Sequence, residues 1–466
     1  MGEIGLGVPS LPTYLLIPVT ILTGVLMLFA MVRIRNRPAA FVMGAAWLRY
    51  IMSAFHEVTY RPLVAGMSSN ALGSIGMVGL GLLTINWRHL AFKLLLPIYA
   101  MIIVAGISTI ANGPQAISGF ITVATKFGYL IVVTLSVFES LRRARRGDFM
   151  TAFLWVFVAP LIFQLFSIVL HIAKHTESDQ CPTCSDSLSY IGGYHHEAAF
   201  SVVLATALLA ACFAERLNKY IRNGIVLVCL VGIFFANYRT TIIAITPFLA
   251  AYFGFSSLSR FPRRDRPFVS SAIILFGCIA FGLATIVLGD RFQDLGVVAT
   301  GHTNLLKPPE EFSVDETRVL SGRAHIWSQY IYAWIRGSTI NHLFGFGPES
   351  WQNVFRLYAH NTLVNNLYEY GFPGVVGALW LWFSMLVAAL RVRHPQRGML
   401  VGAHVSFIVL NMSTMPMWMI EGNLLYGLIC GYTLYLLSLQ RRTPARKEQS
   451  GSRSHPALEL EQRPGA

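Results

Sequence analysis

The sequence predicts an all-α, polytopic integral membrane protein with about 12 to 13 transmembrane helices and one large periplasmic loop. Three observations support this prediction. Apolar residues make up 54% of the chain and charged residues only 12%, about half the charged fraction of a soluble protein. The mean hydropathy is +0.55. Uncharged stretches long enough to cross a ~30 Å hydrocarbon core recur along the chain, and the period-two alternation of a membrane barrel is absent.

The apolar stretches are separated by short polar connections. The first stretch is long and has no basic residues before it, which favours a retained span over a signal peptide. Twelve crossings remain an alternative, because the first stretch or the glycine-rich third stretch need not cross. The candidate spans are 12–32, 38–55, 70–86, 92–110, 119–139, 149–172, 197–214, 222–238, 240–258, 268–289, 363–390, 398–415 and 418–438.

The net charge of +14 is distributed unevenly over the connections. Lys and Arg concentrate on alternate connections, such as 33–37, 142–146, 260–266 and 391–397, and in the C-terminal tail. The positive-inside rule places these segments in the cytoplasm. The charge therefore indicates topology rather than a nucleic-acid partner. It predicts a periplasmic N-terminus and a cytoplasmic C-terminus.

This topology divides the chain into four parts. Residues 1–289 hold about ten transmembrane helices and an outer loop at 173–196. Residues 290–362 form the large periplasmic loop, with short interfacial helices. Three more transmembrane helices occupy 363–440. Residues 441–466 are polar and rich in Pro and Ser, which predicts a disordered cytoplasmic tail.

The outer loop at 173–196 contains a CxxC pair, Cys181 and Cys184. On the oxidising side of the membrane a disulfide is the default interpretation. A zinc site that adds His171 and His175 is the competing interpretation, and unpaired thiols without a role are the third. None of the three makes the pair catalytic.

The large loop carries an aromatic segment and a tight turn. Trp327, Tyr330, Tyr332 and Trp334 are residues typical of the membrane–water boundary, so we expect an amphipathic helix in the interface. The glycines and proline of LFGFGPESW (343–351) predict the turn that follows. A loop of this length with such features is more typical of a functional segment than of a spacer.

Arg239 is the one charged residue in the stretch 223–259. A single helix over this stretch would be about 55 Å long, nearly twice the ~30 Å hydrocarbon thickness. Two short spans with a turn at Arg239 fit better, and the topology then places Arg239 at the outer surface. It is either an interfacial arginine that snorkels to headgroups or an anion-binding group beside a helix N-terminus.

Four stretches, in this order, resemble the O-antigen ligase and O-antigen polymerase superfamily of bacterial envelope glycosyltransferases. They are GGYHHEAAFS (192–201), NYRTTIIAI (237–245), SGRAHIW with LFGFGPESW (321–351), and AHNTLVNNLYEYGFPGVVGAL (359–379). The resemblance covers residues 190–380. The N-terminal third of the chain is similar to the family in hydropathy alone.

The resemblance implies an enzyme of the bacterial inner membrane that acts on its periplasmic face. Its donor would be an undecaprenyl-diphosphate-linked oligosaccharide and its acceptor a sugar hydroxyl, in an inverting, metal-independent reaction without a cofactor. The product would be an exported or surface polysaccharide, built from repeat units by a polymerase. The alternative is a ligase that transfers the glycan to the lipid A core. Besides the bilayer, other polysaccharide-assembly proteins would be partners.

Carried over by position, the resemblance implies that Arg239 and Arg323 bind the diphosphate and that His360 is catalytic. His196, Glu197 and Asn361 would support them. Two features depart from the family pattern: a second histidine, His195, precedes His196, and the CxxC loop is not a family feature. Both departures concern the acceptor.

The rival function class is a transporter or flippase. Such proteins carry ionisable residues within their spans, and here Arg49 and Lys126 are the main candidates. The sequence shows no inverted or parallel repeat of the kind common in transporters.

Overall fold

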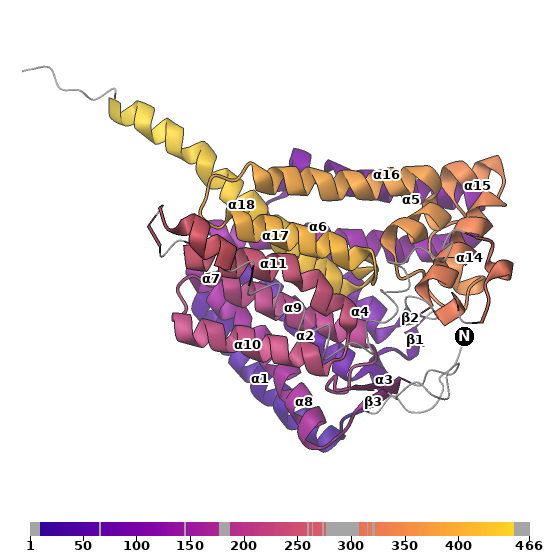
Figure 1. Ribbon diagram of the computed structural model, residues 1–466, viewed down its shortest axis with the longest axis horizontal. Helices are drawn as coiled ribbons and strands as arrows, with labels where there is room; N and C mark the ends of the chain where they lie inside the picture. Colours follow the sequence, from indigo (N-terminus) through magenta and orange to yellow (C-terminus); the bar gives the residue numbers. More distant parts are fainter. Residues whose placement is uncertain are drawn as a thin grey trace, which may run out of the picture.

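The computed structural model is a bundle of helices with few strands (Figure 1). It describes residues 10–64, 67–143, 146–176, 187–258, 261–262, 264–272, 275, 307–314, 316–318 and 322–451. Six helices in these ranges are long and apolar enough to cross a membrane: Thr13–Ile34, Lys93–Asn112, Pro114–Arg143, Phe149–Val169, Thr362–Leu390 and Ile420–Gln440. They identify the chain as an all-α, multi-pass membrane protein, as its composition predicts.

The secondary structure is almost entirely helical. The α-helices are α1 (Thr13–Ile34), α2 (Arg37–Ala54), α3 (His56–Thr59), α4 (Ser69–Thr84), α5 (Leu96–Asn112), α6 (Ile117–Arg143), α7 (Arg146–Phe153), α8 (Val158–Val169), α9 (Glu197–Phe213), α10 (Lys219–Phe235), α11 (Arg239–Leu258), α14 (Arg323–Ile335), α15 (Thr339–Phe344), α16 (Thr362–Leu390), α17 (Arg397–Asn411) and α18 (Ile420–Gly451). Short 3₁₀ helices include η7 (Ser350–Asn353) and η8 (Pro416–Trp418). Two antiparallel ribbons pair β1 (Pro62–Val64) with β2 (Met67–Ser68), and β3 (Lys174–Thr176) with β4 (Ser187–Ser189).

Each predicted span coincides with a helix of the structure, apart from 268–289, most of which lies outside the described residues. The helices Ser69–Thr84, Glu197–Phe213 and Arg397–Asn411 are apolar but shorter than the six long ones. An isolated crossing needs about 20 residues. The number of helices that cross, and the orientation of the termini, therefore stay predictions.

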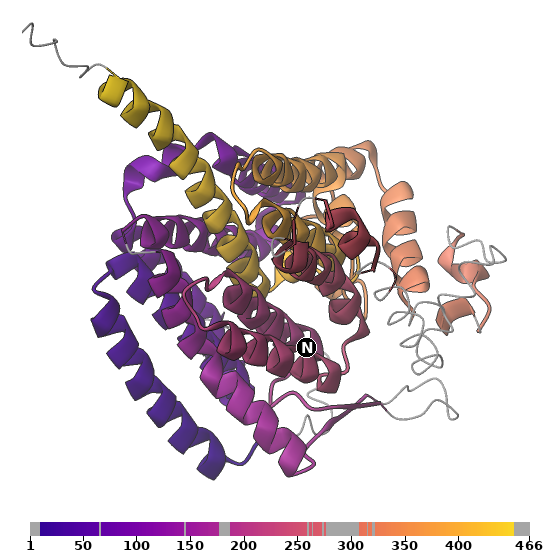
Figure 2. The ribbon, with the colours of Figure 1, turned by 60° about the vertical axis from the view of Figure 1, so that its left-hand side comes forward.

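The connections between helices gather at two opposite ends of the bundle. Figure 1 shows α3, β1, β2, β3, α14 and α15 at one end, and α7 with the extension of α18 at the other. Figure 2 shows the same extension projecting away from the bundle. The charge pattern predicts that the end with α14 and α15 faces the periplasm, and we call it the outer end.

The core of the bundle is centred on α6 and α18. Residues 129–141 of α6 are buried throughout. Two glycines of α18 allow the close approach, because a Cβ added at Gly431 would lie 2.5 Å from the Thr134 carbonyl oxygen, and one at Gly427 would lie 2.6 Å from the Val133 side chain. Small residues at a helix–helix contact are a common device in membrane proteins. This contact holds α18 against α6, and the start of α18 borders the cavity described below.

Two sequence predictions differ from the structure. Helix α14 forms where the amphipathic interfacial helix is expected, but Tyr330 is buried and stacks on Phe355 with ring centroids 4.0 Å apart. This tyrosine is therefore buried inside the protein and does not face outward. Helix α18 continues through Gly451, into the predicted disordered tail. The segment after Gln440 contains Arg, Ala, Lys, Glu and Gln, all good helix formers.

The turn at 345–351 packs tightly on α6. A Cβ added at Gly119 would lie 2.1 Å from the Pro348 carbonyl oxygen. Gly119→Ala should therefore displace the turn and destabilise the protein by about 1–3 kcal/mol, as overpacking does. Thermal unfolding in detergent measures this, with Gly79→Ala as the matched control, because nothing lies within 4 Å of a Cβ added there. Equal melting temperatures for the two variants would contradict this close contact.

Candidate functional site

The candidate site begins at the turn between α10 and α11. Asn237 adopts the left-handed conformation with φ 53°, which is uncommon for a residue other than glycine. Arg239 is the first residue of α11 and is half-buried, while the neighbouring Thr240 is buried. The hydroxyls of Thr241 and Ser201, 2.7 Å apart and buried, fasten the start of α11 to α9. Arg239 therefore lies at a helix N-terminus, where the backbone favours anions.

Helix α14 brings Arg323 to this turn. Gly322 precedes the helix with φ 79°, and Arg323 is its first residue. The Nη2 of Arg323 lies 3.4 Å from the Thr240 hydroxyl, one residue along the chain from Arg239. Arg323 also interacts electrostatically with Tyr238. Arg323 of the large loop thus lies next to the turn at Arg239.

The same face of α14 holds the segment that precedes His360. Arg323, Trp327 and Tyr330 follow one another at i, i+4 and i+7, which puts them on one side of a helix. Trp327 donates its indole N–H to the Ala359 carbonyl at 2.8 Å, and the Tyr330 hydroxyl donates to the Leu357 carbonyl at 2.9 Å. His360 follows Ala359 directly, so the helix that carries Arg323 also positions His360.

His360 has an unusual backbone and an available ring nitrogen. Its φ is 53°, and residues held in this region by their surroundings often belong to functional sites. Its imidazole packs on the Tyr358 ring with centroids 3.8 Å apart, and its buried Nδ1 has no hydrogen-bond partner among the described residues. Burial, then the positive charge of Arg323 and then His196, lowers the pKa of His360 to about 3. The ring is therefore neutral near pH 7.

His196 precedes α9 as its N-cap residue and lies close to Tyr358. Its Nδ1 accepts a hydrogen bond from the Ala198 backbone N–H at 3.1 Å, so the neutral ring carries its proton on Nε2. That Nε2 lies 3.4 Å from the Tyr358 hydroxyl. Glu197 pairs with Lys174 at 3.2 Å. His196 thus both caps a helix and directs a polar atom towards the candidate site.

Asn361 has a structural place in the fold. Its side-chain oxygen accepts from the backbone N–H groups of Leu363 and Val364 at 2.9 and 3.2 Å, which caps α16. Its side-chain nitrogen donates to the Met412 carbonyl at 3.2 Å. The residue therefore fixes the start of α16, one position after His360, and its contacts are those of a helix cap.

An ion pair that the sequence did not predict supports Tyr358. The Lys126 ammonium of α6 lies 2.5 Å from the Glu349 carboxylate, which also accepts from the Trp418 indole N–H at 2.9 Å. Trp418 stacks on Tyr358 with centroids 5.5 Å apart, and Tyr358 contacts His360. Burial opposes the ionisation of Glu349, but the charge and hydrogen bond of Lys126, together with the hydrogen bonds from Trp418 and Gln352, lower the pKa of this carboxyl. The charged pair thus holds the aromatic ring against which His360 packs.

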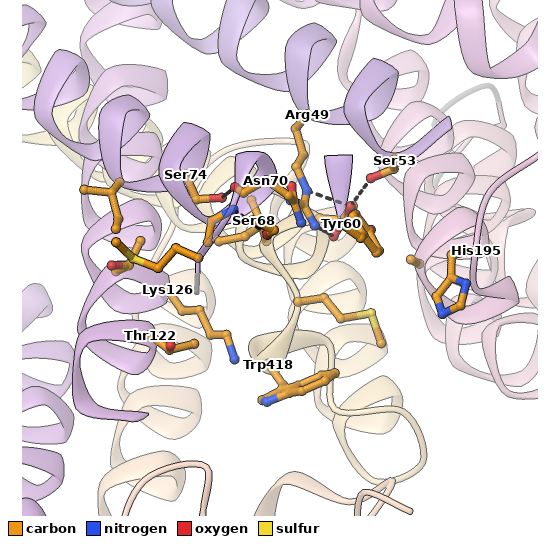
Figure 3. A pocket seen from close by; sticks show the side chains of 18 of the residues that line it. Arg49, Ser53, Tyr60, Ser68, Asn70, Ser74, Thr122, Lys126, His195 and Trp418 are labelled. Atoms are coloured by element: carbon orange, nitrogen blue, oxygen red, sulfur yellow. Dashed lines mark hydrogen bonds and ion pairs between the residues drawn. The ribbon is translucent and has the colours of Figure 1, made fainter. Parts of the chain in front are cut away.

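A cavity of about 690 Å³ adjoins these residues at the outer end of the bundle. His196 and Tyr358 line it, so it lies next to the cluster of Arg323 and His360, neither of which lines it. Figure 3 shows Arg49 and Asn70 on one side of the cavity, Lys126 and Trp418 on the opposite side, and His195 on a third. Arg49 pairs with Glu421 at 2.8 Å. Both residues that would mark a transporter therefore border the cavity, and both are paired with carboxylates.

The contribution of the buried Arg49–Glu421 ion pair to stability can be tested by substitution. Arg49→Met leaves the Glu421 carboxylate buried without its partner and should destabilise the protein by about 3–5 kcal/mol. The double variant Arg49→Met/Glu421→Leu removes both charges and should recover most of this loss. Thermal unfolding of the single and double variants measures both effects. A double variant less stable than Arg49→Met would contradict the pairing.

The disulfide candidates Cys181 and Cys184 lie outside the described residues. His171 and His175, the two histidines of the competing zinc interpretation, are both exposed. Within the described part of the chain no group of three His, Cys, Asp or Glu side chains is arranged to hold a metal ion.

The chain matches no protein-family model, and no curated protein is recognisably similar to it. Its function is therefore inferred from the residues that the fold brings together.

Proposed function

We propose that this protein is a glycosyltransferase at the periplasmic face of a bacterial inner membrane. It takes the glycan of an undecaprenyl-diphosphate-linked oligosaccharide and joins it to a sugar hydroxyl. The observation that supports this best is the proximity of Arg323 to the turn at Arg239, together with the electrostatic contact of His360 with Arg323 and His196. These four residues come from four positions that are distant in the sequence.

The two arginines suit a diphosphate leaving group. Negative charge grows on the diphosphate as the glycosidic bond breaks, and guanidinium groups already held in place stabilise that charge without reorganising. The planar guanidinium matches phosphate oxygens in pairs. The N-terminus of α11 adds backbone N–H groups directed towards an anion.

His360 suits the role of the base. In a single displacement, the acceptor oxygen bonds to the anomeric carbon while the bond from that carbon to the diphosphate oxygen breaks. The electron pair leaves with the diphosphate, and the proton of the acceptor hydroxyl passes to the imidazole. The neutral ring of His360 has an available nitrogen for that proton. This reaction inverts the anomeric configuration.

The product we propose is an exported or surface polysaccharide, extended by one repeat unit in each transfer. The alternative acceptor is the lipid A core, which would make the protein a ligase. Both reactions use the same donor and the same leaving group. They differ in the acceptor, so purified lipid A core and a lipid-linked repeat unit offered in parallel distinguish them.

A gradient-free turnover assay tests the proposal against a transporter. The purified protein is mixed in detergent with undecaprenyl-diphosphate oligosaccharide, where no compartment and no ion gradient exist. We expect longer glycans and one undecaprenyl diphosphate released for each bond formed, measured by mass spectrometry. Transport of the lipid in sealed vesicles without any bond formation would favour the transporter instead.

A further inference from the structure

Apart from His196 and Tyr358, the side chains that line the cavity beside Tyr358 have no role in the proposed reaction. Its volume of about 690 Å³ lies in the usual range of small-molecule sites, about 300–1,000 Å³. Residues of α2, α4, α6 and α18 line it together with His196 and Tyr358. Tyr358 in turn contacts His360, which does not line the cavity. The hydrogen-bonding groups and charges of the cavity walls indicate which class of ligand the cavity can bind.

The hydroxyls in the cavity walls offer acceptor lone pairs. Ser74, Thr122 and Thr125 each donate their proton to a backbone carbonyl within their own helix, at 2.9, 3.1 and 2.7 Å. Ser53 donates its proton to Glu421 at 2.8 Å. A hydroxyl that has donated its one proton can still accept. The walls therefore complement a ligand that donates many hydrogen bonds.

The cavity is balanced in charge. Each cation that lines it in the described part of the chain has a carboxylate partner: Arg49 pairs with Glu421 and Lys126 with Glu349. The pKa of His195 is lowered to about 4, first by burial and then by His56 and Lys174, so this ring is neutral near pH 7. An anionic ligand would have to compete with carboxylates already in place.

One wall of the cavity is apolar. Ile75 of α4 and Ile117 and Ile121 of α6 line this wall. These side chains are solvent-exposed by 39%, 50% and 48%, respectively. Closer to the predicted cytoplasmic end, α4 and α6 meet tightly, because a Cβ added at Gly81 would lie 2.8 Å from Val132. Ser53 and Tyr60 also line the cavity, so a ligand needs both an apolar face and hydroxyl groups.

We propose that this cavity binds an uncharged sugar of an amphiphilic glycan, and that this sugar is the acceptor end of the transfer reaction. The hydroxyls of the sugar donate to the Ser and Thr oxygens of α4 and α6. The apolar part lies against Ile75, Ile117 and Ile121. The attacking hydroxyl then points past Tyr358 and His196 towards His360. The acceptor role rests on the proposed function, whereas the binding of an uncharged sugar does not.

Protection of a cysteine in the cavity tests this without relying on turnover. Thr122 is exposed to the cavity, so Thr122→Cys should react with a maleimide in the full-length, reconstituted protein. Octyl maltoside, an uncharged sugar amphiphile, should slow the labelling of this cysteine at least about 10-fold at saturation. Val354→Cys, at an exposed position outside the cavity, is the matched control and should show no protection. Because the chain has 6 cysteines of its own, the labelling of the unsubstituted protein is subtracted from that of each variant.

Octyl glucuronide and octyl phosphocholine serve as charged probes of matched chain length. The proposal expects that neither protects Thr122→Cys at the concentration where octyl maltoside saturates. Equal protection by all three would overturn it in favour of a general lipid crevice. Protection by octyl glucuronide alone would contradict the proposal that the ligand is an uncharged sugar.

Ser118 of α6 also lines the cavity. The bulky variant Ser118→Trp separates this proposal from the proposed function. It should raise the KM for a sugar acceptor at least about 10-fold while kcat and the affinity for the lipid-linked donor stay unchanged. If no glycan transfer is found but octyl maltoside protects Thr122→Cys, the cavity is still a sugar-binding site, and the proposed glycosyltransferase activity is rejected. If transfer is found and Ser118→Trp has unchanged acceptor KM, the acceptor site lies elsewhere.

Discussion

Arg323→Lys is expected to lower the rate of glycan transfer by about 10²–10³-fold, which corresponds to ~2–4 kcal/mol of lost transition-state stabilisation. Lysine keeps the charge, but its ammonium cannot bind two phosphate oxygens in the forked geometry of a guanidinium. Arg239→Lys should show a loss of the same order, because both arginines are proposed to bind the one diphosphate. Single-turnover rates with a saturating lipid-linked donor measure both variants.

Arg336→Lys is the matched control for these variants. Arg336 follows the same helix, α14, but its guanidinium forms an exposed pair with Glu310 at 2.7 Å. Its replacement by lysine should leave the transfer rate unchanged. Full activity in both Arg239→Lys and Arg323→Lys would contradict a diphosphate site at this place.

His360→Ala should lower transfer by about 10²–10⁴-fold, the usual contribution of a general base, while expression and donor binding stay intact. The contacts of His360 explain this separation, because Trp327 and Asn361 hold the backbone on either side of it. Donor binding is measured by equilibrium binding of the labelled lipid. His325→Ala changes another histidine of the same loop, which packs on Phe312, and should retain activity.

The pH profile gives an independent test of His360. The pKa of His360 is about 3, so the ring is neutral between about pH 5 and pH 8 and adds no acid limb to kcat/KM there. A bound diphosphate offsets the charge of Arg323, which raises the pKa of His360 in the complex. We therefore expect an acid limb in kcat that is absent from His360→Ala. If His360→Ala keeps most of its turnover from pH 6 to 8, His360 has a structural role and Glu197 is the first candidate for the base.

The helices of this protein were predictable because the bilayer requires apolar segments of about 20 residues. Every predicted span in the described residues coincides with a helix, including the break at Arg239. Burial within the large loop was less predictable. Tyr330 looks like a boundary residue in the sequence, yet it packs on Phe355 and Tyr368. The spacing of Arg323, Trp327 and Tyr330 at i, i+4 and i+7 was a signal that one face of this helix packs inward.

The contacts that hold the candidate site together join residues far apart in the chain. Lys126 and Glu349 are separated by 223 positions, and Trp418 and Glu349 by 69. Sequence spacing cannot show such pairs. A lone lysine within an apolar span nevertheless requires a partner, because burying an unpaired charge is costly. That requirement was a signal in the sequence that Lys126 has a partner of opposite charge, but it does not identify Glu349.

A structure of the protein with bound undecaprenyl diphosphate tests the central claim most directly. Our account predicts the diphosphate between the guanidinium groups of Arg239 and Arg323 at the N-terminus of α11, with the His360 ring facing the oxygen that carries the glycan in the donor. A diphosphate bound instead in the neighbouring cavity, beside Lys126 and Arg49, would contradict it.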